Sequence, residues 1–229
     1  MGRHTLNGNP PIDVSLRRSR RAKRLSLRVS RLDGRVTLTL PHLAAEREGI
    51  SFLRAKEAWL RSHLDQLAPV QTVAIGEQIM LRGKMTPIVA GEGKRLVIAD
   101  QQIAAPGPEG LGLKIKAQLR QIARNALVEA SDRYAGLLGQ SYTRISIRDT
   151  RSRWGSCSSQ GALMYSWRLI MAPPSVLDYV AAHEVAHLVE MNHSAAFWAV
   201  VEKICPGYKA ERDWLRQHGD RLHRVNFDN

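Results

Sequence analysis

Two histidines and a glutamate stand at a spacing that suits a metal site. Residues 183–187 read His-Glu-Val-Ala-His. If residues 175–190 form one helix, His183 and His187 project from the same face one turn apart, which suits two Zn–N bonds of about 2.0–2.1 Å. Glu184 lies beside the pair, where it can address a water molecule rather than the metal. The pattern predicts metal-assisted hydrolysis, with Glu184 as catalytic acid and base.

A third histidine, His193, follows His183 by ten residues. In a continuous helix it would lie about 280° around from His183, because each residue adds about 100°. We therefore expect the helix to end first, with Asn192 in the left-handed conformation and Ser194 capping a second helix over residues 195–204. Three imidazoles leave one tetrahedral position open for water, which favours one Zn²⁺ ion per chain, held by His183, His187 and His193.

The elements that must position this site alternate between strand and helix patterns. Residues 25–30 and 36–40 alternate as strands around an Asp33-Gly34 turn, which predicts a hairpin. We expect a helix over residues 44–67, short strands over 70–105, a long helix over 111–138, and strands over 142–148 and 161–171. Pro and Gly cluster at residues 105–110, which predicts a β-rich basic N-terminal region with one helix over 1–105 and a metallohydrolase domain over 106–229.

Composition limits the classes of protein that fit. The 229 residues contain no run of about 20 apolar residues, so a membrane-spanning helix is not expected. The N-terminus shows no secretory signal, and two cysteines cannot supply a disulfide framework. The expected location is the cytoplasm.

Basic residues are concentrated near the N-terminus. The chain has 34 Lys and Arg against 21 Asp and Glu, a formal net charge of +13, and residues 17–35 alone hold nine of the basic groups. Such a cluster indicates an anionic partner, for which the candidate residues are Arg17, Arg18, Arg20 and Arg21. The alternative is an exposed strand edge kept soluble by its charge.

Several separated motifs occur in an order that resembles a known family. They are Ser152-Arg153-Trp154-Gly155-Ser156-Cys157, Trp167-Arg168-Leu169-Ile170-Met171-Ala172-Pro173-Pro174, the His183–His187 motif, and Asn192-His193-Ser194 followed by Phe197-Trp198. Together they resemble the YgjP-like metallopeptidase domain, which is related to SprT-like and other zincin proteases. The resemblance covers roughly residues 12–218. It implies an α+β fold with a zincin-like core, an active-site helix and a small mixed sheet.

The resemblance also implies that His183, His187 and His193 bind zinc, that Glu184 is the catalytic acid and base, and that the reaction is peptide hydrolysis. Metzincins share the spacing of the three histidines, but they carry Gly where this chain has Glu190, so their substrate chemistry is not carried over.

Other residues are weaker candidates, and two other functions stay open. Arg168 and Tyr208 are candidates for stabilising an oxyanion, and the strand at 161–171 is a candidate edge for binding an extended peptide. Arginines at 17–35 and at 144–153 also suit a metal-dependent hydrolase of nucleotides or other phosphoanhydrides. The second alternative is a protease that its basic face recruits to nucleic acid.

Overall fold

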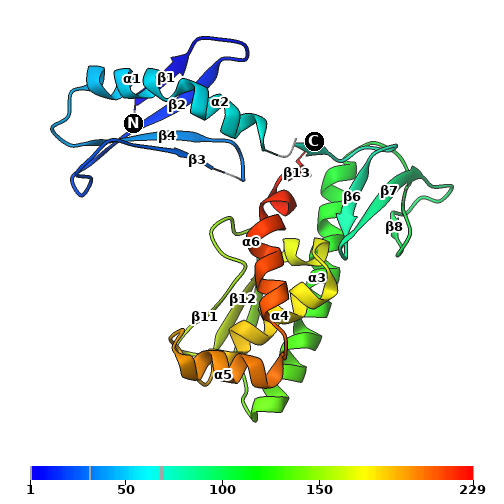
Figure 1. Ribbon diagram of the computed structural model, residues 1–229. Helices are drawn as coiled ribbons and strands as arrows, with labels where there is room; N and C mark the ends of the chain where they lie inside the picture. Colours follow the sequence, from blue (N-terminus) through cyan, green and yellow to red (C-terminus); the bar gives the residue numbers. More distant parts are fainter. Residues whose placement is uncertain (1, 31, 68–69, 229) are drawn as a thin grey trace. The chain divides into compact units, whose positions relative to one another are not determined.

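A computed structural model describes residues 2–30, 32–67 and 70–228 (Figure 1). The chain divides into two compact units, Met1–Pro69 and Val70–Asn229. Together they confirm the α+β class and the strand-rich N-terminal region that the sequence predicts. No helix in the described ranges is both long enough and apolar enough to cross a membrane.

The N-terminal unit is a four-stranded sheet with two helices. Its strands are β1 (Gly2–Leu6), β2 (Ile12–Ser19), β3 (Ser26–Val29) and β4 (Val36–Pro41), in the order β1-β2-β4-β3. The β3–β4 pair confirms the predicted hairpin, and Gly34 adopts the positive φ of 70° that its turn requires. The predicted helix over 44–67 is two helices, α1 (Glu46–Ala55) and α2 (Glu57–Asp65), separated at Lys56.

The second unit contains the remaining elements of the chain. It begins with the strands β5 (Gln71–Thr72), β6 (Gln78–Leu81), β7 (Lys84–Ala90), β8 (Val97–Ile98) and β9 (Ile103–Ala105). Next come α3 (Leu111–Leu138), β10 (Arg144–Arg148), β11 (Gly155–Cys157), β12 (Ala162–Ser166) and a 3₁₀ helix over Trp167–Met171. The unit ends with α4 (Pro174–Ala186), α5 (Ala195–Ile204), α6 (Lys209–His223) and β13 (Val225–Asn226).

The division between the units falls at residues 69 and 70, whereas the sequence placed it at 105 and 106. Residues 70–105 pack with the second unit because their apolar side chains share its core. Ile79, Ile88 and Ile103 are fully buried in the same cluster as Ile115 and Leu119 of α3. Backbone bonds add to this packing, since the N–H groups of residues 82 and 83 donate to the carbonyl oxygens of residues 170 and 171.

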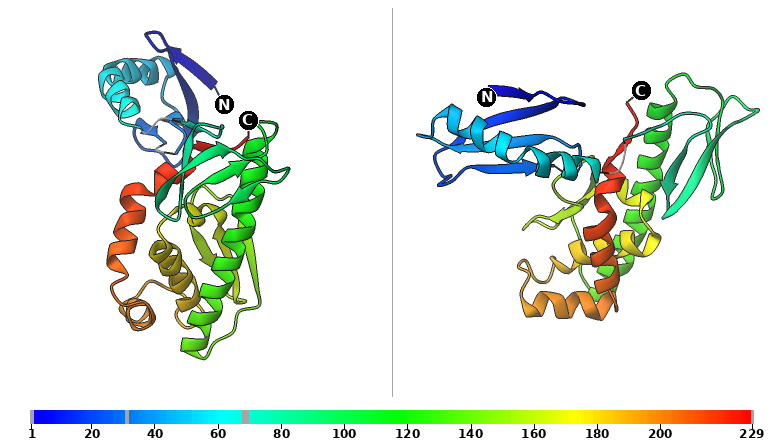
Figure 2. Two further views of the ribbon diagram at one scale, coloured as in Figure 1. Left: turned by 90° about the vertical axis from the view of Figure 1, so that its right-hand side faces the viewer. Right: turned by 45° about the horizontal axis from the view of Figure 1, so that its top comes forward.

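A small mixed sheet and the helices around it position the candidate site. The strand order is β10-β12-β11, with β10 and β12 parallel and β11 and β12 antiparallel. Leu163 and Tyr165 of β12 are buried in the core with α3 and α4, and α4 lies against α3, α5 and α6 (Figure 2). Because α4 is enclosed in this way, most of its side chains are buried, including Val180, Ala181 and Val185.

The segment 161–171 differs from its prediction in two respects. Its strand ends at Ser166, and Trp167–Met171 form a 3₁₀ helix that the apolar pattern did not reveal. The strand β12 also lies in the middle of its sheet, with β10 on one side and β11 on the other. The proposal that this strand offers a free edge to a peptide is therefore wrong.

Candidate metal centre

The three histidines come from the end of α4 and the turn that follows it. His183 lies in the last turn of α4, and His187 is the residue at which the helix ends. The helix thus stops before His193, as predicted. The predicted left-handed Asn192 is wrong, because Arg82 is the one non-glycine residue of the described ranges with a positive φ. Instead, the side chain of Asn192 accepts a hydrogen bond from the Ser194 N–H at 3.0 Å, which forms a local turn.

The second helix begins where the sequence predicts. Ser194 is the N-cap of α5, and its hydroxyl group accepts a hydrogen bond from the N–H of Phe197 at 3.4 Å. The cap fixes the entry to α5 directly after His193. Phe197 is fully buried, and the centre of its ring lies 4.5–4.9 Å from the centres of all three imidazoles. Its ring therefore packs against all three imidazoles and gives them an apolar surface on one side.

The ring nitrogens converge on one point. One nitrogen from each of His183, His187 and His193 lies within 4.8 Å of the other two. The Nε2 atoms of His183 and His193 are 3.0 Å apart. Nδ1 of His187 is 2.9 Å from the carbonyl oxygen of Glu190, which can only accept, so Nδ1 carries the proton and Nε2 presents its lone pair to the other rings.

This donor set fits a zinc ion. Two nitrogens bound tetrahedrally to zinc at about 2.0–2.1 Å lie about 3.3 Å apart, close to the His183–His193 separation. Metal binding also requires neutral imidazoles. Burial, followed by the nearby His187, His193 and Arg212, lowers the pKa of His183 to about 3, and burial lowers the pKa of His187. Both rings are therefore neutral at physiological pH.

The carboxyl group of Glu184 is held from the opposite side by β11. The residue is 6% exposed, and the backbone N–H of Cys157 donates to its carboxylate. A Cβ atom at Gly155 would lie 2.5 Å from Oε1 of Glu184, so only glycine leaves room for this carboxyl group. Burial raises the pKa of Glu184 to about 8, although the charge of Arg153 and the Cys157 N–H favour its ionised form. The group can hold or release a proton near neutral pH.

The donors of Arg168 are engaged by other parts of the second unit. Its guanidinium donates to both carboxylate oxygens of Asp149, at 2.7 and 3.3 Å, and to the carbonyl oxygens of Leu222 and Val225. It is 9% exposed. With its donors engaged in this way, it braces the fold, and we do not propose it as a group that stabilises an oxyanion.

Tyr208 is linked to the histidines by two other aromatic rings, Tyr179 and Trp198. Its ring stacks on Tyr179 at 5.9 Å and on Trp198 at 5.2 Å, and these two rings lie 5.9 and 5.7 Å from His183. Tyr208 itself is 5% exposed. The stack forms one wall of the site, and a role for the Tyr208 hydroxyl group in catalysis stays a prediction.

The four N-terminal arginines belong to the other unit of the chain. Arg17 and Arg18 are in β2, and Arg20 and Arg21 follow it. Arg18 donates to the carbonyl oxygens of His42 and Ala44, which ties β2 to the segment before α1. The remaining charge of this cluster is exposed, and its role as an anion site stays a prediction.

Sequence reasoning missed three contributors to the site. Gly155, Phe197 and Arg153 all lie in the motifs that carried the family resemblance, yet none of them belongs to a residue type that binds metal. Their roles depend on contacts with Glu184 or with the histidines, which residue spacing alone does not reveal.

A basic hollow lies on the sheet face opposite α4. It has a volume of about 410 Å³, and its lining includes three arginines and four hydroxyl side chains but no carboxylate. They are Arg144, Arg148, Arg153, Ser146, Thr150, Ser152 and Ser156. Ser156 stands between Gly155 and Cys157, so β11 separates this hollow from the carboxyl group of Glu184.

A family model agrees with the chemistry of the site. The model of the YgjP-like metallopeptidase domain matches residues 23–218. None of the curated proteins matches the chain. A crystal structure of the metallopeptidase zymogen of Pyrococcus abyssi abylysin aligns with 24% identity over 40% of this chain and 92% of that chain, with a TM-score of 0.37.

Proposed function

Because the chain belongs to the YgjP-like metallopeptidase family, we propose that it hydrolyses peptide bonds with one Zn²⁺ ion held by His183, His187 and His193. The observation that carries this proposal is the convergence of three imidazole nitrogens within 4.8 Å, beside the buried carboxyl group of Glu184. Their donor type and spacing are those of zinc sites that keep one position open.

The metal and the protein divide the chemistry between them. When bound, zinc at such a site polarises the scissile carbonyl group and lowers the pKa of water to about 7. Glu184 accepts the proton of the attacking water on its carboxylate and later donates that proton to the leaving amine. The Cys157 N–H and the glycine at 155 hold the carboxylate in place for both transfers. The Glu190 carbonyl oxygen keeps the His187 ring in the tautomer that binds metal.

The substrate is a peptide or protein segment in extended form. We place it along β11, which is an edge strand and carries the two residues that contact the Glu184 carboxyl group. Backbone pairing with an edge strand aligns an extended chain without fixing its side chains. The scissile bond then lies beside the residue that transfers the proton.

Metal content is the first test of this function. Purified protein should hold about one zinc per chain by elemental analysis, and His187→Ala should lose it. His42→Ala, a change at an exposed histidine of the N-terminal unit, should retain the metal and serves as the matched control. If the purified protein holds no metal and takes up none when zinc is added, the proposal is wrong.

The basic hollow favours a second candidate, hydrolysis of a phosphoanhydride such as a nucleoside triphosphate. One arginine side chain can bind two phosphate oxygens, and the hollow offers three arginines, on the face of β11 opposite the one that contacts Glu184. Release of phosphate or pyrophosphate from nucleoside triphosphates by the zinc-loaded protein tests it. Arg144→Gln with Arg148→Gln should abolish this release and leave cleavage of a neutral peptide unchanged. Cleavage of the peptide without any release of phosphate or pyrophosphate favours the peptidase.

A further inference from the structure

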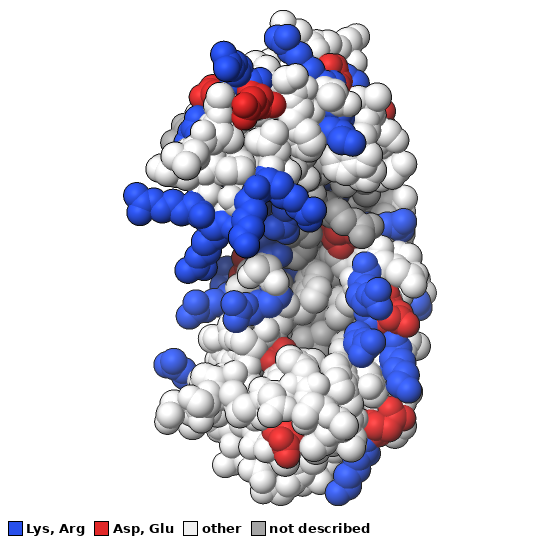
Figure 3. Space-filling view, turned by 60° about the vertical axis from the view of Figure 1, so that its left-hand side comes forward, with Lys and Arg blue, Asp and Glu red and all other residues white. Residues whose placement is uncertain are grey.

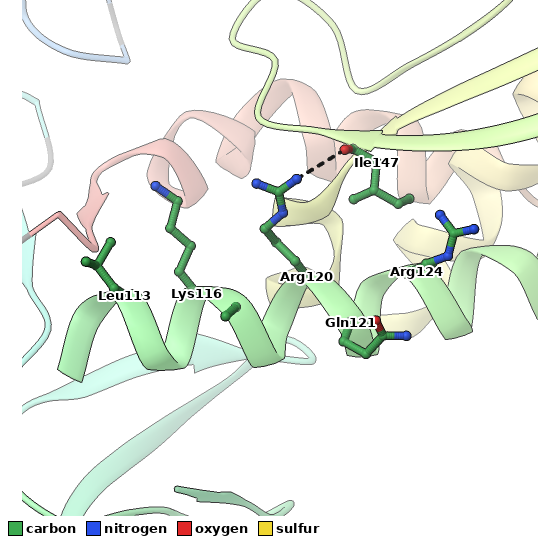
Figure 4. A pocket seen from close by; sticks show the side chains of 7 residues that line it. Leu113, Lys116, Arg120, Gln121, Arg124 and Ile147 are labelled. Atoms are coloured by element: carbon green, nitrogen blue, oxygen red, sulfur yellow. Dashed lines mark hydrogen bonds between the residues drawn. The ribbon is translucent and has the colours of Figure 1, made fainter. Parts of the chain in front are cut away.

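The helix α3 carries an unusual row of positive charge. Residues 111–128 contain four basic and no acidic side chains. Lys116, Arg120 and Arg124 stand at successive one-turn intervals and project from the same side of α3, with Arg120 directed at Ile147 of β10 (Figure 4). Like charges four residues apart destabilise a helix, so a solvated face would more commonly alternate in sign.

The row lines a hollow that reaches the edge of the small sheet. The hollow has a volume of about 480 Å³, and Ile147 of β10 contributes to its lining. Arg120 donates to the carbonyl oxygen of Ile147 at 3.4 Å, whereas Lys116 pairs with Asp228 at 2.7 Å. Asp228 is 70% exposed, so this ion pair is weak and opens readily to a competing anion.

The positive surface continues across β10 to the opposite face of the sheet. Side chains alternate along a strand, so Ile147 faces α3 while Arg144 and Arg148 face the hollow described above. β10 is an edge strand, and the two hollows lie on its two sides. Asp149, the nearest acidic residue in the sequence, is engaged by Arg168. Figure 3 shows that Lys and Arg side chains gather in groups on the face in view.

We propose that the α3 row and the β10 arginines together bind the phosphate backbone of a nucleic acid. Residues four apart on a helix rise by about 6 Å, so the row spans about 12 Å, which equals the rise of three to four nucleotides along the axis of a duplex. Neither hollow is lined by an aromatic residue, so the site supplies no platform for base stacking and contacts phosphates without reading sequence. The site does not depend on the proposed peptidase activity.

The test measures binding of the full chain to a fluorescent 20-base-pair DNA duplex of mixed sequence between 50 and 200 mM NaCl. Reversal of the row, by Lys116→Glu, Arg120→Glu and Arg124→Glu, should weaken binding at least tenfold. It should also flatten the dependence of log K on log [salt] by about 2–3, since each lost phosphate contact removes about 0.9. The matched control reverses three exposed lysines of the same unit, by Lys94→Glu, Lys203→Glu and Lys209→Glu, and should change affinity less than threefold.

Thermal melting checks that both triple variants are folded. If the glutamate variant is not, the neutral set Lys116→Gln, Arg120→Gln and Arg124→Gln replaces it, with the same expected order. Equal losses in the row variant and its control would mean that overall charge alone attracts DNA, and the proposal would be wrong. It would also be overturned if wild-type protein fails to bind at 50 mM NaCl, or if poly-glutamate of similar charge competes as well as the duplex does.

Discussion

At the scale of single residues, the Cys157 N–H and the glycine at 155 hold the carboxyl group of Glu184 in place. Glu184→Gln keeps the size of the side chain but cannot take up a proton from water. We expect this variant to hold the same amount of zinc as the wild type and to hydrolyse peptides about 100-fold to 10,000-fold more slowly, the range typical of a lost general acid and base. Elemental analysis and turnover should be measured on one preparation. Wild-type turnover by the metal-loaded variant would rule out the role.

A substitution at Gly155 tests the position of the Glu184 carboxyl group without changing Glu184 itself. In Gly155→Ala, the added methyl group would lie within 3 Å of three side-chain atoms of Glu184, so the carboxyl group must move. The expected result is full zinc content with hydrolysis reduced at least tenfold. Gly136→Ala is the control, because its Cβ would meet nothing within 4 Å and alanine favours a helix by about 1 kcal/mol. Full activity in Gly155→Ala would contradict the close approach.

His223 makes the stability of the second unit depend on pH. Burial, and then the charge of Arg168, lower its pKa to about 4, with Arg151 adding to the shift and Asp149 and Asp220 opposing it. Between pH 6.5 and about 4, the unfolded chain binds this proton and the folded chain does not. Stability therefore rises with pH across this range and falls as the pH is lowered.

The replacement His223→Phe keeps an aromatic ring against Trp154, whose ring centre lies 4.9 Å away, and removes the titrating group. Urea unfolding at a series of pH values should show a shallower loss of stability in the variant between pH 6.5 and 4. The difference in slope cannot exceed about 1.4 kcal/mol per pH unit, the value for one proton. Parallel curves for the two proteins would show that His223 does not titrate in this range.

At the scale of elements, Arg168 joins three parts of the second unit. It belongs to the 3₁₀ helix, and it binds Asp149 after β10 and two carbonyl oxygens at the junction of α6 and β13. Arg168→Met leaves the carboxylate of Asp149 without this partner and should lower the free energy of unfolding by about 3 kcal/mol. Arg216→Met breaks an exposed pair with Asp213 and should cost less than about 1 kcal/mol. Equal urea midpoints for the two variants would contradict the bracing role.

The elements also show what the sequence could and could not predict. The spacing of His183, His187 and His193 predicts the metal site because helical periodicity and a helix stop are local properties. The form of the stop was not predictable, since the Asn192 side chain completes the turn without a left-handed residue. The role of Arg168 was equally hidden, because its carbonyl partners lie 54 and 57 residues away in the chain.

At the scale of the whole molecule, the boundary between regions was predicted from a cluster of Pro and Gly residues. Pro and Gly at residues 105–110 mark a loop, but a loop can join two elements of one core. The described residues form two separate apolar clusters, one within residues 6–64 and the other within residues 73–227. The second cluster crosses the 105–110 loop, with Ile88 and Ile103 on one side of it and Ile115 on the other.

Two fragments, residues 70–229 and residues 106–229, distinguish a boundary at residues 69 and 70 from one at residues 105 and 106. We expect residues 70–229 to fold alone, melt cooperatively and bind about one zinc ion, because this fragment keeps its whole apolar cluster and all three histidines. Residues 106–229 should be unfolded or strongly destabilised. They lack the buried side chains that cover α3, and they also lose the bonds from residues 82 and 83 to the segment before α4 and the β5–β13 pair. Circular dichroism melting and zinc content of both fragments make the comparison. If 106–229 folds and binds zinc as well as 70–229 does, residues 70–105 are not part of the core, and the boundary lies where Pro and Gly place it.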